Sequence, residues 1–75
     1  MRKHYNQTVG FADRLTKSMY DKEVNNTQLA KKIGMERKAV AMYVNGYSMP
    51  NSLILARICR VLNVSVDYLL FGEKR

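Results

Sequence analysis

The residues that decide the fold of this chain are 25–46, NNTQLAKKIGMERKAVAMYVNG, near the middle of its 75 residues. Leu29 and Ile33 lie four positions apart, a spacing that puts both side chains on one face of a helix. Gly34 follows at once, and glycine adopts the left-handed backbone of a tight turn without steric cost. Apolar residues at helical spacing resume beyond it, from Val40 onward. The segment therefore predicts two short amphipathic helices joined by a tight turn.

The ends of these two helices carry local signals of their own. Asn25 is a strong N-cap residue, and Gln28 follows three positions later, which is the pattern of a capping box. The second helix is expected over residues 37–45, because Gly46 closes it as Gly34 closes the first. The sequence therefore marks both ends of the first helix and the end of the second.

Three further helices are expected, which makes the fold class all-α with five helices. They span about residues 8–21, 51–62 and 66–70. Pro50 breaks the chain before the fourth helix, Asn51 caps that helix, and Asn63 takes the left-handed position at its end. Ser65 caps the fifth helix. The chain is expected to form one domain with a core over about residues 8–72 and short flexible termini.

The apolar face of each helix predicts the core. The expected core residues are Phe11, Ala12, Leu15, Met19, Leu29, Ala30, Ile33, Val40, Tyr43, Leu55, Ile58, Cys59 and Leu62. On the first helix, Asp13, Arg14 and Lys17 are assigned to the opposite, solvated face. Cys59 is expected to be a small buried filler.

The charge of the chain favours a polyanionic partner. Lys and Arg number 13 against 6 Asp and Glu, so the net charge is +7. When clustered Lys and Arg side chains bind nucleic-acid phosphates, the counterions condensed on the phosphates are released, and this release favours binding. Nucleic acid is therefore the first candidate. A membrane surface is the weaker alternative, because no helix sets a cationic face against one rich in Trp or Phe. No membrane partner is expected.

Several functional classes are excluded by what the sequence lacks. His4 is its only histidine and Cys59 its only cysteine, and it has neither a glycine-rich phosphate loop nor a pair of carboxylates set for catalysis. We therefore expect no catalytic residue, metal site, cofactor or small-molecule ligand. There is no apolar run of about 20 residues and no secretory signal, so we expect a cytoplasmic protein with Cys59 reduced.

The chain resembles a Cro/lambda-repressor-type (XRE) helix-turn-helix domain from about Phe11 to Gly72. The resemblance is carried by TQLAKKIG in the first helix of the motif, VAMYVNG at the end of the second, Pro50 before the fourth helix and LNVSVDYLLFG at the close. It implies a five-helix, lambda-repressor-like DNA-binding domain. The function it implies is a bacterial or phage transcriptional regulator, a repressor, that inserts its third helix into the major groove of double-stranded DNA.

The resemblance also implies which residues meet DNA. The base-reading candidates on the third helix are Arg37, Lys38, Ala41 and Met42. The phosphate-contacting candidates are Asn25, Asn26, Thr27, Lys32, Asn45, Tyr47 and Ser48. For Tyr47, covering the edge of the core is an equal alternative, and for Arg37 and Lys38 the alternative is a merely solvated helix end.

Four positions depart from the pattern of the resembled family. Glu23 stands where many members have glycine, which predicts an unusual turn after the first helix. Glu36 stands where serine or threonine usually caps the third helix; it is a poorer cap, and its charge opposes nearby phosphate. Met19 and Val44 replace an arginine and a glutamate that pair in many members, so we predict an apolar contact between these two side chains.

Two questions of partnership stay open at the level of sequence. A homodimer is expected from the resemblance, because such repressors bind two half-sites about one helical turn apart. Its candidate contacts are Tyr68, Leu69, Leu70 and Phe71, and the alternative is a monomer that buries all four. The rival function is a protein-interaction module on the same fold, like an antitoxin or antirepressor.

Overall fold

The computed structural model describes the backbone of residues 6–72 and the side chains of residues 10–72. Within this range the chain forms five helices and no strand, so the predicted all-α fold is confirmed. The helices are α1 (Asn6–Asp21), α2 (Asn26–Ile33), α3 (Arg37–Val44), α4 (Ser52–Leu62) and α5 (Val66–Phe71). α1 begins two residues before its expected start. Of the termini predicted to be flexible, residues 1–5 and 73–75 lie outside the described residues.

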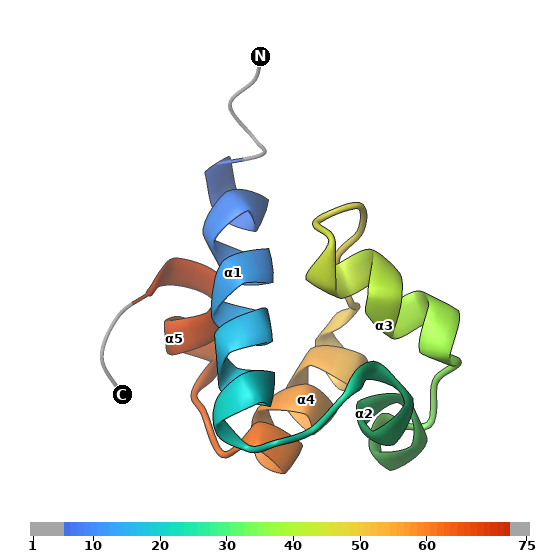
Figure 1. Cartoon of the computed structure of the whole chain (residues 1–75). Helices are drawn as coiled ribbons and strands as arrows, with labels where there is room; N and C mark the ends of the chain where they lie inside the picture. The colour runs from blue at the N-terminus through green and yellow to red at the C-terminus, as the bar shows by residue number, and fades with distance from the viewer. Residues whose placement is uncertain (1–5, 73–75) are drawn as a thin grey trace.

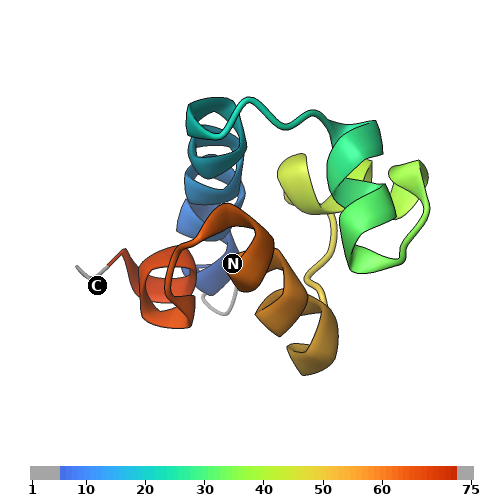
Figure 2. The ribbon, with the colours of Figure 1, turned by 90° about the horizontal axis from the view of Figure 1, so that it is seen from below.

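Two pairs of helices form the sides of the molecule. α1 packs against α5 on one side, and α2 packs against α3 on the other (Figure 1). α4 joins the two pairs because it contacts both α2 and α5 (Figure 2). α1 also contacts α3, so the first helix of the chain lies beside the second helix of the central motif.

The core lies where these five helices converge. Every predicted core residue except Ala12, which is half-buried, is buried, and Ile54 and Leu69 join them. Burying one Leu or Ile side chain stabilises the fold by about 1.5–3 kcal/mol, which holds together helices too short to be stable alone. Burial raises the pKa of the Cys59 thiol, which keeps this side chain protonated and unreactive.

The predicted capping box at the start of α2 is confirmed. The Asn25 side chain accepts a hydrogen bond from the backbone amide of Gln28 at 2.8 Å, and the Gln28 side chain accepts one from the backbone amide of Asn25 at 2.9 Å. The caps predicted for α4 and α5 are also present, since Asn51 accepts from Ile54 and Ser65 accepts from Tyr68 through their backbone amides.

Left-handed residues end the helices as the sequence predicts. Gly34 closes α2 with φ +78°, and Asn63 closes α4 with φ +58°. The unusual turn predicted at Glu23 is confirmed as well, because Glu23 has φ +58° in the turn that follows α1. A side chain with a Cβ costs about 1–2 kcal/mol in this conformation, and unlike asparagine, glutamate has no short polar group to offset it.

Replacing Glu23 with glycine is therefore expected to stabilise the protein. The relief of about 1–2 kcal/mol is partly offset by the greater freedom of glycine in the unfolded chain, about 0.4–1 kcal/mol, which leaves a gain of about 0.5–1 kcal/mol. Urea denaturation followed by circular dichroism measures it. Asn63→Gly is the matched control, with a smaller gain, and a less stable Glu23→Gly variant would contradict the strain at this turn.

The assignment of Arg14 to a solvated face is wrong. Its Nε donates to the backbone oxygen of Leu69 at 3.0 Å, and its Nη2 donates to that of Leu70 at 2.9 Å. These carbonyls belong to the last turn of α5, where a helix has unpaired acceptors and a partial negative charge. Arg14 therefore fastens α5 to α1, whereas Asp13 and Lys17 are exposed as predicted.

Candidate nucleic-acid interface

The first turn of α2 presents unpaired backbone donors. The capping box occupies the amides of Asn25 and Gln28, and the amide of Leu29 donates to the oxygen of Asn25. The amides of Asn26 and Thr27 have no acceptor within the described residues. A helix start with two free amides and a partial positive charge is suited to bind an anion such as a phosphate group.

The outer face of α3 is exposed and basic at its start. Val40 and Tyr43 are buried on the inner face, whereas Arg37 and Lys38 are exposed in the first turn. Further along the outer face, Ala41 is half-buried and the Met42 side chain is 38% exposed. The α3 face thus offers two cations followed by small and flexible apolar groups.

The cap of α3 is weak, as Glu36 predicts. Its side chain makes no cap hydrogen bond, although its backbone has the extended conformation of an N-cap residue. The carboxylate is exposed and lies next to Arg37 in the chain. The start of α3 therefore carries one negative charge beside its two positive ones.

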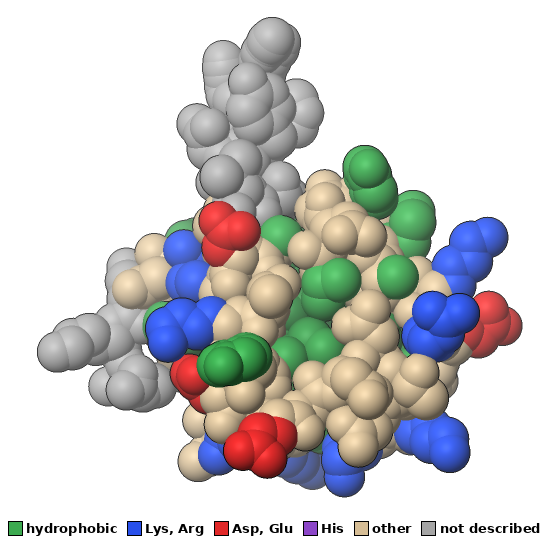
Figure 3. All heavy atoms as spheres, viewed as in Figure 1, with side chains coloured by type: hydrophobic (Ala, Val, Ile, Leu, Met, Phe, Trp, Pro, Cys, Tyr) green, Lys and Arg blue, Asp and Glu red, His purple; other side chains and the backbone are tan. Residues whose placement is uncertain are grey.

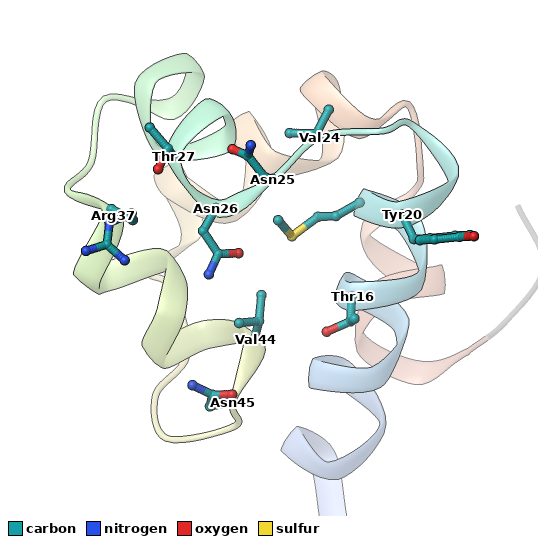
Figure 4. Close-up of a pocket in the computed structure, with 10 residues that line it drawn as sticks. Thr16, Tyr20, Val24, Asn25, Asn26, Thr27, Arg37, Val44 and Asn45 are labelled. Atoms are coloured by element: carbon teal, nitrogen blue, oxygen red, sulfur yellow. The ribbon is translucent and has the colours of Figure 1, made fainter.

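A surface hollow of about 620 Å³ lies between α1, the start of α2 and α3 (Figure 4). Its lining residues are Thr16, Met19, Tyr20, Val24, Asn25, Asn26, Thr27, Arg37, Val44 and Asn45. In Figure 3 apolar side chains form its floor, between the polar surfaces of the helices on either side. The structure thus gathers five predicted DNA-contacting residues around one hollow.

The structure brings together some of the remaining candidates and separates others. Tyr47 and Ser48 are exposed in the turn after α3, and because Tyr47 is 75% exposed it does not cover the edge of the core. Lys32 lies elsewhere: it lines a separate hollow with Lys22 of the α1–α2 turn and Val61 of α4. Its phosphate contact therefore stays a prediction, at a place separate from the hollow that Arg37 lines.

The candidate dimer residues of α5 differ in exposure. Leu69 is fully buried in the core of its own chain, which removes it from any contact with a partner. Tyr68 and Leu70 are half-buried, and the Phe71 side chain is 61% exposed. Phe71 is therefore the main apolar group that α5 offers to its surroundings.

Sequence reasoning missed the contribution of α1 to this interface. Thr16 and Tyr20 line the hollow from α1, and the Tyr20 side chain is 82% exposed. Their spacing of four, next to the buried Met19, indicates a helix face at the edge of the core and could have suggested it. Met19 and Val44 line the same hollow, while a direct contact between them stays a prediction.

Residues 22–69 match the helix-turn-helix family, and this range includes α2, the turn at Gly34 and α3. The chain belongs to the helix-turn-helix family. The match confirms the XRE-type helix-turn-helix resemblance of the sequence.

A relative and a solved structure support this assignment. The chain is 36% identical over 63 residues to a Bacillus subtilis protein named as the uncharacterized HTH-type transcriptional regulator YqaE, covering 84% of this chain and 54% of that protein. This chain therefore spans about half the length of that relative. The solution structure of the SOS-response transcriptional repressor LexA from Eubacterium rectale has a TM-score of 0.82 and 18% identity, covering 93% of this chain and 72% of that one. At this identity the likeness shows the fold.

The described residues show neither a metal-binding cluster nor a membrane-spanning helix. Within the described residues, no group of three or more His, Cys, Asp and Glu side chains is placed to hold a metal ion. None of the helices in residues 6–72 has the length and apolar character needed to cross a bilayer.

Proposed function

We propose that this helix-turn-helix domain is a sequence-specific regulator that binds double-stranded DNA by inserting α3 into the major groove. The observation that carries the proposal is the exposed α3 face, which has Arg37 and Lys38 in its first turn. Arg37 lines the same hollow as Asn26 and Thr27, whose amides are free. The B-DNA major groove is wide enough for an α-helix. A domain that occupies its site can repress by excluding other proteins, so repression is the simplest regulatory role.

Sequence would be read by the outer face of α3. Arg37 and Lys38 donate hydrogen bonds, and the acceptors they match best are O6 and N7 of guanine. Ala41 and Met42 offer only apolar contact, which suits the methyl group of thymine. The preferred site is therefore expected to contain at least one guanine next to a position that favours thymine.

Position and register would be fixed by phosphate contacts on two sides of α3. The amides and side chains of Asn26 and Thr27 lie on one side, with Asn25 as the cap that orients them. Asn45, Tyr47 and Ser48 lie at the far end of α3 and in the turn that follows. Contacts of this kind place a protein on the duplex and carry no base information directly.

We also propose that two copies bind two half-sites about one helical turn of DNA apart, with Phe71 at the contact between them. The support is the exposure of this large aromatic side chain at the end of α5. Sedimentation velocity at micromolar concentration, with and without operator DNA, tests it. A protein that stays strictly monomeric on its operator would show that the domain does not act as a homodimer.

The salt dependence of duplex binding tests the proposed function. The logarithm of the binding constant is expected to fall linearly with the logarithm of salt concentration, by about 0.9 for each phosphate neutralised. Fluorescence anisotropy of a labelled duplex over a salt series measures this slope. If the domain is instead a protein-interaction module, no duplex will bind in a salt-dependent way at micromolar protein, and the proposal fails.

A further inference from the structure

The hollow between α1 and α3 combines an apolar floor with polar groups around it. Met19, Val24 and Val44 supply the apolar part. In Figure 4 the carboxamide of Asn26 and the hydroxyl of Thr16 are directed toward the hollow from opposite sides. A nucleotide unit of the DNA backbone has the complementary character, since its sugar presents C–H groups and its phosphate presents hydrogen-bond acceptors.

The charge of the hollow also fits the DNA backbone. Its lining includes one cation, Arg37, and no aspartate or glutamate. Three other surface hollows of the described chain each include Asp21 or Glu23, whose carboxylates repel phosphate. The α1–α3 hollow is thus the one among these four in which a phosphate meets only neutral or positive groups.

The hollow is continuous with the surface already assigned to DNA. Asn25, Asn26 and Thr27 reach it from the start of α2, and Arg37 and Asn45 reach it from the two ends of α3. A duplex that lay against both of these groups would cover the hollow. DNA is therefore the occupant that the neighbouring residues favour.

We propose that this hollow seats one sugar–phosphate unit of the bound duplex, so that α1 is a third anchor beside α2 and the turn after α3. The sugar carbons lie against Met19 and Val44. The hydroxyl of Thr16 and the carboxamide of Asn26 donate hydrogen bonds to phosphate oxygens. The inference rests on the proposed function and deepens it, because it adds Thr16 as a positioning residue that contacts the backbone of any sequence.

Substitutions at two positions test the hollow by different chemistry. Thr16→Val removes the hydroxyl at constant shape and is expected to lower duplex affinity about threefold, a typical value for the net contribution of one hydrogen bond. Thr16→Ser keeps the hydroxyl and should retain the wild-type affinity. Val44→Glu places a carboxylate against the phosphate and should lower affinity about tenfold or more.

Leu53→Glu is the matched control for Val44→Glu. It makes the same change of net charge at a side chain that is 58% exposed on α4 and is not part of the hollow. Anisotropy titrations with one preferred and one unrelated duplex measure all four variants, and thermal unfolding checks that each is folded. The losses for Thr16→Val and Val44→Glu should be the same on both duplexes, since a backbone contact carries no base information.

The outcomes separate this inference from the proposed function. If wild-type protein binds duplex DNA while Val44→Glu and Leu53→Glu weaken binding equally, or Thr16→Val binds like wild type, the seated backbone unit is overturned and the proposed function stands. If wild-type protein binds no duplex, both are overturned. A loss at Val44→Glu well beyond that of Leu53→Glu, together with the loss at Thr16→Val, supports the inference.

Discussion

Replacing Arg37 with alanine is expected to weaken binding to the preferred duplex by about 1–3 kcal/mol and to relax the preference at one base position. Arg37 is exposed in the first turn of α3, and its guanidinium presents donors in a planar fork that matches O6 and N7 of guanine. Alanine removes these donors and leaves the helix intact, because alanine is the best helix former. Titration of the preferred duplex and of single-base variants measures both effects.

Lys32→Ala is the matched control for this prediction. It removes the same unit of charge, but Lys32 faces a hollow with Val61 of α4, away from Asn26 and Arg37. We therefore expect a small and sequence-independent loss from this variant. If Arg37→Ala weakens binding equally on every duplex, as the loss of a general cation would, Arg37 does not read a base.

Replacing Arg14 with methionine is expected to lower the free energy of unfolding by about 1.5–3 kcal/mol, the range for hydrogen bonds to a charged group. The guanidinium donates to Leu69 and Leu70 at 3.0 and 2.9 Å, and these two bonds hold the end of α5 against α1. Methionine keeps the apolar stem and loses both donors. In a domain of this size each kcal/mol lowers Tm by about 4–8 °C, so the change is readily measured by thermal unfolding.

Arg14→Lys separates the hydrogen bonds from the charge. Lysine keeps the positive charge near the end of α5 but lacks the planar fork that reaches two carbonyls, so an intermediate stability is expected. Room for the guanidinium depends on Gly10, because a Cβ at that position would overlap it. Equal stability of Arg14→Met and wild type would show that α5 is held by its apolar side chains alone.

The features of the fold that were predicted correctly depend on local sequence. Asn25 and Gln28 form their capping box within one turn of chain, and Asn63 and Gly34 adopt left-handed backbone because of their own chemistry. Helical spacing likewise placed Leu29 and the other core residues, since 3.6-residue periodicity determines which face is buried. Such features need no knowledge of how the helices pack.

The features that were missed depend on packing between distant segments. Arg14 looks like a solvated residue on its own helix, and only the docking of α5, some 55 residues later, supplies its acceptors. The hollow that Lys32 lines also depends on packing, since it includes Val61 of α4 and not Arg37 of α3. Thr16 lies in the candidate interface because α1 contacts α3, and this contact depends on the packing of the two helices.

Selection of bound sites from random duplex DNA at physiological salt would show whether α3 reads base sequence. If α3 reads bases through Arg37 and Lys38 with Ala41 and Met42 beyond them, the wild-type protein should enrich a short motif that contains guanine next to a thymine-favouring position. If it also binds as a homodimer, the motif should recur about one helical turn away. Recovery of unenriched random sequence, or of no DNA at all, would show that α3 is not a sequence-reading helix.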